Sequence, residues 1–197
     1  VAALGASSYT YVEATRTQRI EDWLASHNRM VEFYGGVTRM TVPDQLRSAV
    51  SRPCRFEPGI ARSYVQWARH YATAVVPARP RRPKDKAKVE VAVQVAQRWV
   101  LARLRNETFF SLGALNARIA ELCKDMNARP MRSYGGASRR ELFERLDKSA
   151  LRPLPETRFE IAEWGDAGVN GDYHIEIDKH LYSVPHALIG SRIEKRK

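Results

Sequence analysis

The stretch Ala78-Arg-Pro-Arg-Arg-Pro-Lys-Asp-Lys-Ala-Lys-Val-Glu90 combines prolines, a dense cluster of basic side chains and a final carboxylate. Its prolines exclude a continuous helix, because proline fixes φ and donates no backbone hydrogen bond. Beyond it, apolar residues recur at helical spacing, namely Val89, Val93, Ala96, Val100 and Leu104. Glu90 is therefore expected in the first turn of an amphipathic helix. A carboxylate held among basic residues there indicates a place where an acidic side chain meets a polyanion.

Charge and composition favour an anionic partner. The 197 residues include 33 Lys and Arg against 22 Asp and Glu, which gives a net charge of +11 and a pI near 10.0. Nucleic acid is the simplest such partner, and a basic protein without one is the alternative. Cys54 and Cys123 stand far apart, and the histidines lack metal-ligand spacing, so disulfides and zinc are not expected. Without an apolar run of membrane-spanning length or a visible signal peptide, we expect a cytoplasmic protein with no membrane partner.

The first half of the chain reads as strand, strand, helix, strand. These predicted elements are strands over 1–4 and 9–14, a helix from Ile20 that Gly35-Gly36 ends, and a strand over 37–42. Pro43 ends the last strand, and Asp44 comes directly beyond it. Groups that bind ligands in α/β folds commonly follow a strand in this way.

Helices fill the middle of the chain, and a β module follows. Pro58 is expected to open a helix that carries Tyr64, Trp67 and Tyr71. Later helices are predicted over 112–126 and from the capping box Ser138-Arg-Arg-Glu141, which should bury Leu142, Phe143 and Leu146. After an extended linker at 151–155, short strands are expected at 159–164, 173–177, 182–184 and 189–193. The first part is thus α/β or α+β, with helices on a small sheet.

Asp44 and Glu90 are the candidate chemical pair. Two-metal phosphoryl transfer needs several carboxylates that converge on hard divalent cations about 3.5–4 Å apart, with basic residues around them to hold phosphates. The simpler alternatives are that Asp44 is a turn residue after Pro43 and that Glu90 complements the helix dipole.

Several ordered motifs resemble one family. They are Gly35-Gly36-Val37, Val42-Pro43-Asp44-Gln45-Leu46-Arg47-Ser48-Ala49-Val50, His70-Tyr71, Pro77-Ala78-Arg79-Pro80, Pro83-Lys84-Asp85-Lys86-Ala87-Lys88-Val89-Glu90, Leu104-Arg105-Asn106, Leu115-Asn116 and Tyr182-Ser183-Val184-Pro185. Together they resemble IstA-type bacterial insertion-sequence transposases of the DDE integrase superfamily, along nearly the whole chain. The resemblance implies a ribonuclease-H-like (retroviral-integrase-type) α/β core over residues 1–130, a helical linker over 131–157 and a truncated small β-barrel module over 158–197.

The resemblance also implies a catalytic Asp-Asp-Glu triad. Asp44 matches the second acid, although the family usually places Asn where this chain has Gln45. Glu90 matches the third acid, while the first would lie on a strand upstream of Val1. Glu13 stands on the wrong strand to replace it. The expected phosphate contacts are Arg79, Arg81, Arg82, Lys84, Lys86 and Lys88.

What the family implies for function is metal-dependent DNA cleavage and 3′-hydroxyl strand transfer with Mg²⁺ or Mn²⁺. The implied partners are transposon-end and target DNA, further copies of the protein on that DNA, and a helper ATPase of the AAA+ type. The location would be the bacterial cytoplasm, at the nucleoid. The alternatives are a non-catalytic DNA-binding remnant and a ribonuclease-H-like nuclease. Because the missing first strand is central in such a sheet, a protein of these residues alone should be inactive and poorly stable.

Overall fold

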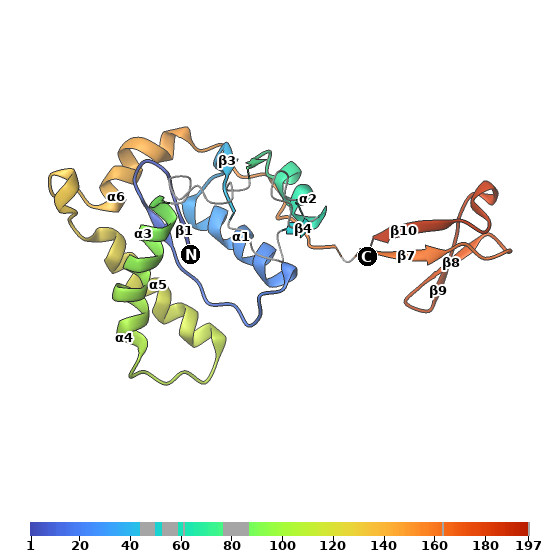
Figure 1. The fold of residues 1–197 in the computed structure, drawn as a ribbon, viewed down its shortest axis with the longest axis horizontal. Coiled ribbons are helices and arrows are strands. Elements are labelled where there is room, and N and C mark those ends of the chain that lie inside the picture. Colours follow the sequence, from blue (N-terminus) through green and yellow to red (C-terminus); the bar gives the residue numbers. More distant parts are fainter. Residues whose placement is uncertain (44–49, 53–58, 61, 77–86, 163, 197) are drawn as a thin grey trace. The chain divides into compact units, whose positions relative to one another are not determined.

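The computed structural model of the chain describes residues 1–43, 50–52, 59–60, 62–76, 87–162 and 164–196 (Figure 1). The chain divides into two compact units, Val1–Phe159 and Glu160–Lys197. Each unit is described by itself.

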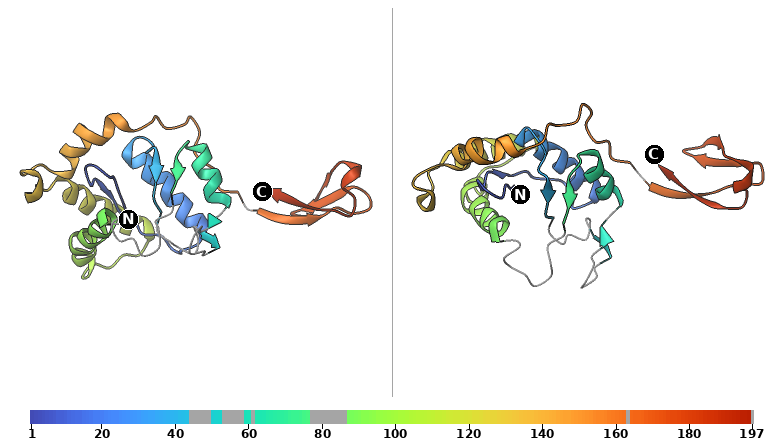
Figure 2. Two further views of the ribbon diagram at one scale, coloured as in Figure 1. Left: turned by 45° about the horizontal axis from the view of Figure 1, so that its top comes forward. Right: turned by 90° about the horizontal axis from the view of Figure 1, so that it is seen from above.

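Unit 1 combines short strands with longer helices. Its strands are β1 (Ala2–Ala3), β2 (Thr10–Tyr11), β3 (Met40–Thr41), β4 (Val50–Arg52), β5 (Gly59–Ile60) and β6 (Ala74–Val75). Its helices are α1 (Ile20–Tyr34), α2 (Arg62–His70), α3 (Ala87–Ala96), α4 (Ala102–Leu104), α5 (Leu112–Ala128) and α6 (Arg139–Leu142). Helices α3 and α5 lie on one side of α1, and α2 lies on the other (Figures 1 and 2).

The strands of unit 1 form separate pairs. β1 pairs antiparallel with β2, as the sequence predicts for the N-terminal hairpin. β3 pairs in parallel with β6, and the two run side by side in Figure 2. β4 pairs antiparallel with β5. The described residues therefore hold the hairpin and the parallel pair as two sheets without hydrogen bonds between them.

Helix α1 confirms the predicted helix and its glycine stop. Gly35 adopts φ +69°, a left-handed conformation that glycine reaches without steric cost. Gly36 packs so tightly that a Cβ atom there would lie 2.7 Å from the carbonyl oxygen of Arg152. Beside it, Val37 and Arg152 exchange two backbone hydrogen bonds of 2.9 Å. The chain after α6 is thereby fixed against the end of α1.

Helix α2 supplies the aromatic core. Tyr64 and Trp67 are fully buried, as expected, and Tyr71 is 5% exposed. The Trp67 indole donates to the Asn28 side-chain oxygen at 2.9 Å, and the Asn28 amide donates to the Phe159 carbonyl at 2.9 Å. The start of this helix was predicted wrongly. It begins at Arg62, because the preceding residues 59–60 are taken by β5.

A second core lies between α3 and α5. The α3 stripe continues through a π-helical turn at Gln97–Leu101 into α4. The buried members of this cluster are Val12, Ala96, Val100, Leu104, Ile119, Leu122, Cys123 and Met126. The capping box at Ser138 is confirmed, with both reciprocal hydrogen bonds present. Leu146 was wrongly expected to be buried: it is 46% exposed, because the helix passes through a π turn at Phe143–Asp147.

Unit 2 is made of two antiparallel pairs. β7 (Trp164–Gly168) pairs with β10 (Arg192–Arg196), and β8 (His174–Ile177) pairs with β9 (His180–Ser183). Buried Ala167, Val169 and Ile175 form its small core, which is joined by partly buried residues including Val184. The outer strands begin about three to five residues later than predicted. All four residues of β9 are exposed, so Tyr182 lies on the surface and does not fill a barrel.

Candidate active site

Residues next to the two candidate acids in the sequence line one cavity. Glu90 lies in the first turn of α3 and is exposed, as the sequence predicts. Asp44 lies outside the described residues, but its neighbour Pro43 is buried just beyond β3. Pro43 and Val89, which directly precede Asp44 and Glu90, line the same cavity of about 690 Å³. The ends of β3 and the start of α3 therefore meet at one place in unit 1.

Two open strand edges face this cavity. Ala3 stands opposite Thr10 in the hairpin, and the N–H and C=O of Thr10 are both bound by Asn127. Ala3 and Thr10 are therefore a pair without hydrogen bonds between them, and the backbone groups of Ala3 point away from β2. The carbonyls of Arg39 and Thr41 accept from β6. Met40 accordingly presents its backbone groups on the other edge of β3. Ala3 and Met40 both line the cavity, which thus separates two strand edges.

The outer edge of the hairpin is closed by asparagines of α5. The Asn127 Oδ1 accepts from the Thr10 N–H at 3.0 Å, and its Nδ2 donates to the Thr10 carbonyl at 2.7 Å. Asn116 makes the same pair of bonds to Ala14, at 2.8 and 2.9 Å. Each amide copies the hydrogen bonds of a neighbouring strand, so no further strand can pair at these positions. The opening for a strand lies on the cavity side.

Glu13 also lines the cavity, but its carboxylate is already engaged. Its Oε2 accepts from the Ser26 hydroxyl at 2.6 Å, and its Oε1 binds the Arg29 guanidinium. The Glu13 side chain is only 9% exposed. These contacts give Glu13 a structural role.

His27 forms part of the cavity floor. Its Nδ1 lies 2.8 Å from the Trp23 carbonyl, to which it donates as a neutral imidazole. Burial lowers the pKa of His27 to about 4, although the hydrogen bond to Trp23 acts in the opposite direction. His27 is therefore uncharged near neutral pH and adds no positive charge to the cavity.

The predicted phosphate contacts cannot be located on the structure. Arg79, Arg81, Arg82, Lys84 and Lys86 lie outside the described residues. Lys88 belongs to the first turn of α3, and its side chain is not described. Asp85, expected to cap the helix, also lies outside the described part.

The side-chain chemistry of the two candidate acids suits a hard divalent cation. Asp44 and Glu90 both offer carboxylate oxygens, which Mg²⁺ and Mn²⁺ prefer. Within the residues that the structure describes, no group of three or more His, Cys, Asp or Glu side chains is placed to hold a metal. None of the described helices combines the length and apolar character that crossing a membrane requires.

Sequence reasoning missed two features near the site. It treated Asn116 as part of a motif without a role, and it did not single out Asn127. Their spacing of eleven residues, or three helical turns, puts both on one face of α5. This spacing could have indicated that both side chains bind the same neighbouring segment. The Trp99 ring, which packs half-buried against the core, carries two arginines that the sequence did not indicate.

The fold is that of a retroviral integrase catalytic core. The BIV integrase catalytic core domain superposes with a TM-score of 0.55 at 11% identity, covering 73% of this chain and 82% of that one. An integrase in a simian T-cell lymphotropic virus intasome superposes with a TM-score of 0.56 at 10% identity, covering 82% and 53%. At such identity the likeness defines the class of fold, a ribonuclease-H-like core.

Sequence comparison adds relatives that are similar over the whole length of this chain. A protein of Burkholderia multivorans assigned as a transposase of insertion sequence IS408 is 51% identical over 196 residues. The transposase of insertion sequence element IS21 from Pseudomonas aeruginosa is 27% identical over 197 residues. A family model described as the Mu transposase C-terminal domain matches residues 154–197. Along its whole length the chain is similar to insertion-sequence transposases of the IS21 (IstA) type.

The matches span all of this chain but only part of each relative. The chain covers 38% of the Burkholderia protein and 50% of the Pseudomonas protein.

Proposed function

We propose that this chain forms part of the catalytic core of a DNA transposase that cleaves transposon ends and transfers their 3′-hydroxyl groups to target DNA. One observation carries the proposal: Pro43 and Val89, the neighbours of Asp44 and Glu90, line a single cavity of an integrase-like core. Convergence of the two acids at such a cavity is what metal-assisted phosphoryl transfer requires.

In this proposal, Asp44 and Glu90 hold divalent metal ions through their carboxylate oxygens. Mg²⁺ or Mn²⁺, when bound, would activate the attacking hydroxyl and stabilise the leaving oxygen of an in-line displacement. Glu90 is exposed at the start of α3, where it can approach a bound phosphate. The basic residues 79–88 would hold the surrounding phosphates and offset the charge of the two acids.

We further infer that a strand from outside residues 1–197 fills the cavity. Ala3 and Met40 leave backbone groups unpaired on its two sides, and a strand between them would join the hairpin to the β3–β6 pair. The relatives have ample chain for this, since these residues make up only 38% of the Burkholderia protein. Such a strand would bring the first acid of the triad beside Asp44. Without it, the residues described here should be inactive.

Strand transfer by the intact protein tests the proposal. Wild-type protein with Mg²⁺ should join an end of its own element to target DNA, and Asp44→Asn and Glu90→Gln should each abolish joining while DNA binding persists. Glu121→Gln is the matched control, because Glu121 is an exposed carboxylate of α5 that pairs with Arg118. Full joining by both site variants would refute the assignment.

The same assay distinguishes an active transposase from the alternative, a non-catalytic DNA-binding remnant. A remnant would bind DNA but join none, with or without the upstream chain. A further preparation containing only residues 1–197 should be inactive, and joining by that preparation would overturn the inference of a missing strand.

A further inference from the structure

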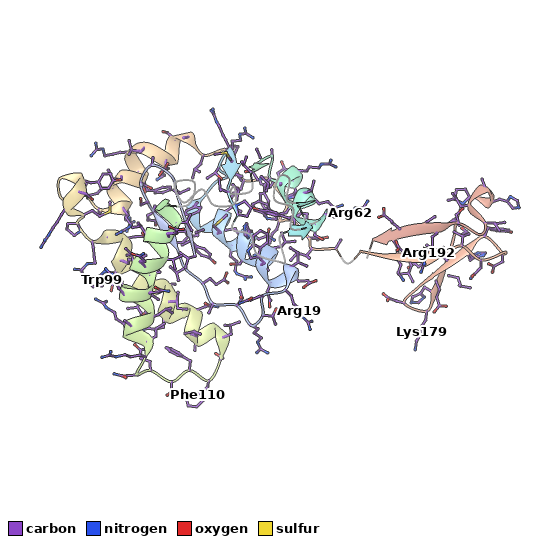
Figure 3. The ribbon with its side chains drawn as sticks, viewed as in Figure 1. Arg19, Arg62, Trp99, Phe110, Lys179 and Arg192 are labelled. Atoms are coloured by element: carbon purple, nitrogen blue, oxygen red, sulfur yellow. The ribbon has the colours of Figure 1, made fainter. Side chains whose placement is uncertain are left out.

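Trp99 lies on the same continuous helical segment as Glu90, nine positions further along the chain. It lies in the π-helical turn Gln97–Leu101, between α3 and α4. Its half-buried ring packs against the core between α3 and α5, on the side of unit 1 away from α2 (Figure 3). Widened π turns of this kind occur frequently at functional sites.

Two exposed arginines lie over the Trp99 ring. The Arg129 Cζ, at the end of α5, is 3.5 Å from the ring centroid, and the Arg103 Cζ, in α4, is 4.9 Å from it. A planar guanidinium stacks on an indole through cation–π attraction. Stacking uses the face of the guanidinium and leaves its edge N–H groups for an acceptor from outside the chain. Trp99 thus orders two donors from different helices.

These arginines are not neutralised. In the described part of the chain, no carboxylate pairs with Arg103 or Arg129. Arg118, also on α5, differs, because it is bound by Glu107 at 3.2 Å and by Glu121 at 2.8 Å. The segment 97–106 around Trp99 contains three arginines and no acidic residue. The stack therefore offers two ordered and uncompensated positive charges.

The geometry points to a phosphate-binding site formed by Trp99, Arg103 and Arg129. This site would bind a phosphate of the DNA backbone at a distance from the phosphate that reacts. This inference rests on the function proposed for Glu90. Nine residues separate Glu90 from Trp99, which is about 14 Å along the helix at 1.5 Å per residue.

Salt titration of duplex DNA binding by the intact protein tests the inference. Each phosphate contact contributes about 0.9 to the slope of log affinity against log salt. Arg103→Gln and Arg129→Gln should each reduce the slope by about this amount. Arg118→Gln is the matched control and should leave the slope unchanged, because its charge is already compensated. Equal slopes for wild type and both stack variants, or the same decrease for Arg118→Gln, would overturn the inference.

Two further variants test the role of the ring. Trp99→Leu removes the stacking surface while keeping both charges, so DNA affinity should fall severalfold, whereas Trp99→Phe should retain most of it. Undiminished binding by a folded Trp99→Leu protein would show that the ring does not order the arginines for DNA. Failure of the wild type to bind any DNA would instead reject the proposed function itself.

A neutral methylphosphonate linkage, moved along the strand from the joining site, locates the contact. Binding by wild type should weaken most with the linkage at one position some nucleotides away from the joining site. The Arg103→Gln, Arg129→Gln double variant should be insensitive at that position, and a wild-type profile in the double variant would contradict the assignment.

Discussion

Asn127→Ala should open the outer edge of the N-terminal hairpin. Asn127 and Thr10 are each 1% exposed, so neither Thr10 backbone group can turn to water after the change. The Thr10 N–H loses its acceptor outright, at a cost of about 1–3 kcal/mol. The Thr10 carbonyl keeps the weaker Cys123 thiol at 3.1 Å, so its loss is smaller, about 1 kcal/mol. The expected local destabilisation is about 3 kcal/mol.

Amide hydrogen exchange measures this local stability directly. In the intact protein, 3 kcal/mol corresponds to roughly hundredfold faster exchange of the segment around Thr10 when closing is faster than chemical exchange. Asn116→Ala removes the same pair of bonds from Ala14 at a half-buried position, where water can replace them, and should accelerate exchange only about fivefold.

Asn127→Leu distinguishes the hydrogen bonds from packing, because leucine fills the space without an amide. It should be as destabilising as Asn127→Ala. The account of edge closure would be refuted if Asn127→Leu exchanged as slowly as wild type, or if the Asn116 and Asn127 variants behaved alike.

Two other changes probe the core around the site. Gly36→Ala would force a Cβ to within 2.7 Å of the Arg152 carbonyl oxygen and should cost about 1–3 kcal/mol in thermal or urea unfolding, whereas Gly113→Ala, with 3.8 Å to its nearest neighbour, should be tolerated. A tolerated Gly36→Ala would show that the contact with residues 151–152 is loose. His27 has a pKa of about 4 in the folded protein and about 6.5 in the unfolded chain. As the pH falls between these values, the unfolded state binds a proton that the folded state does not, so the free energy of unfolding falls by roughly 3 kcal/mol. His27→Leu should remove that part of the pH dependence in unfolding titrations, and an unchanged pH profile would contradict the assignment.

Local signals in the sequence predicted much of the fold. Gly35-Gly36 as a helix stop, the capping box at Ser138 and the apolar stripe of α3 depend on neighbouring residues, and all three are present. The start of α2 was missed because a competing strand pair, β4 with β5, takes the residues after Pro58. The paired residues Val50 and Ile60 are only ten positions apart, but the strands are two and three residues long, and strand formation in such short segments depends on context more than on composition.

The candidate site was predictable only in part. The sequence located Glu90 in the first turn of α3, and the family resemblance supplied its role and that of Asp44. The cavity and the two open edges at Ala3 and Met40 could not be predicted, because they depend on which backbone groups each strand pair already uses. The stack on Trp99 likewise requires that the end of α5 meet α4, which is a consequence of packing and not of sequence spacing.

The proposed metal site is the central claim, and one measurement tests it directly. Fe²⁺ substituted for Mg²⁺ in the intact protein generates hydroxyl radicals that cut the backbone next to the bound ion. The account predicts cuts close to residues 44 and 90, lost in Glu90→Gln and competed away by Mg²⁺. Cuts elsewhere in the chain, or cuts at these positions that persist unchanged in Glu90→Gln, would contradict it.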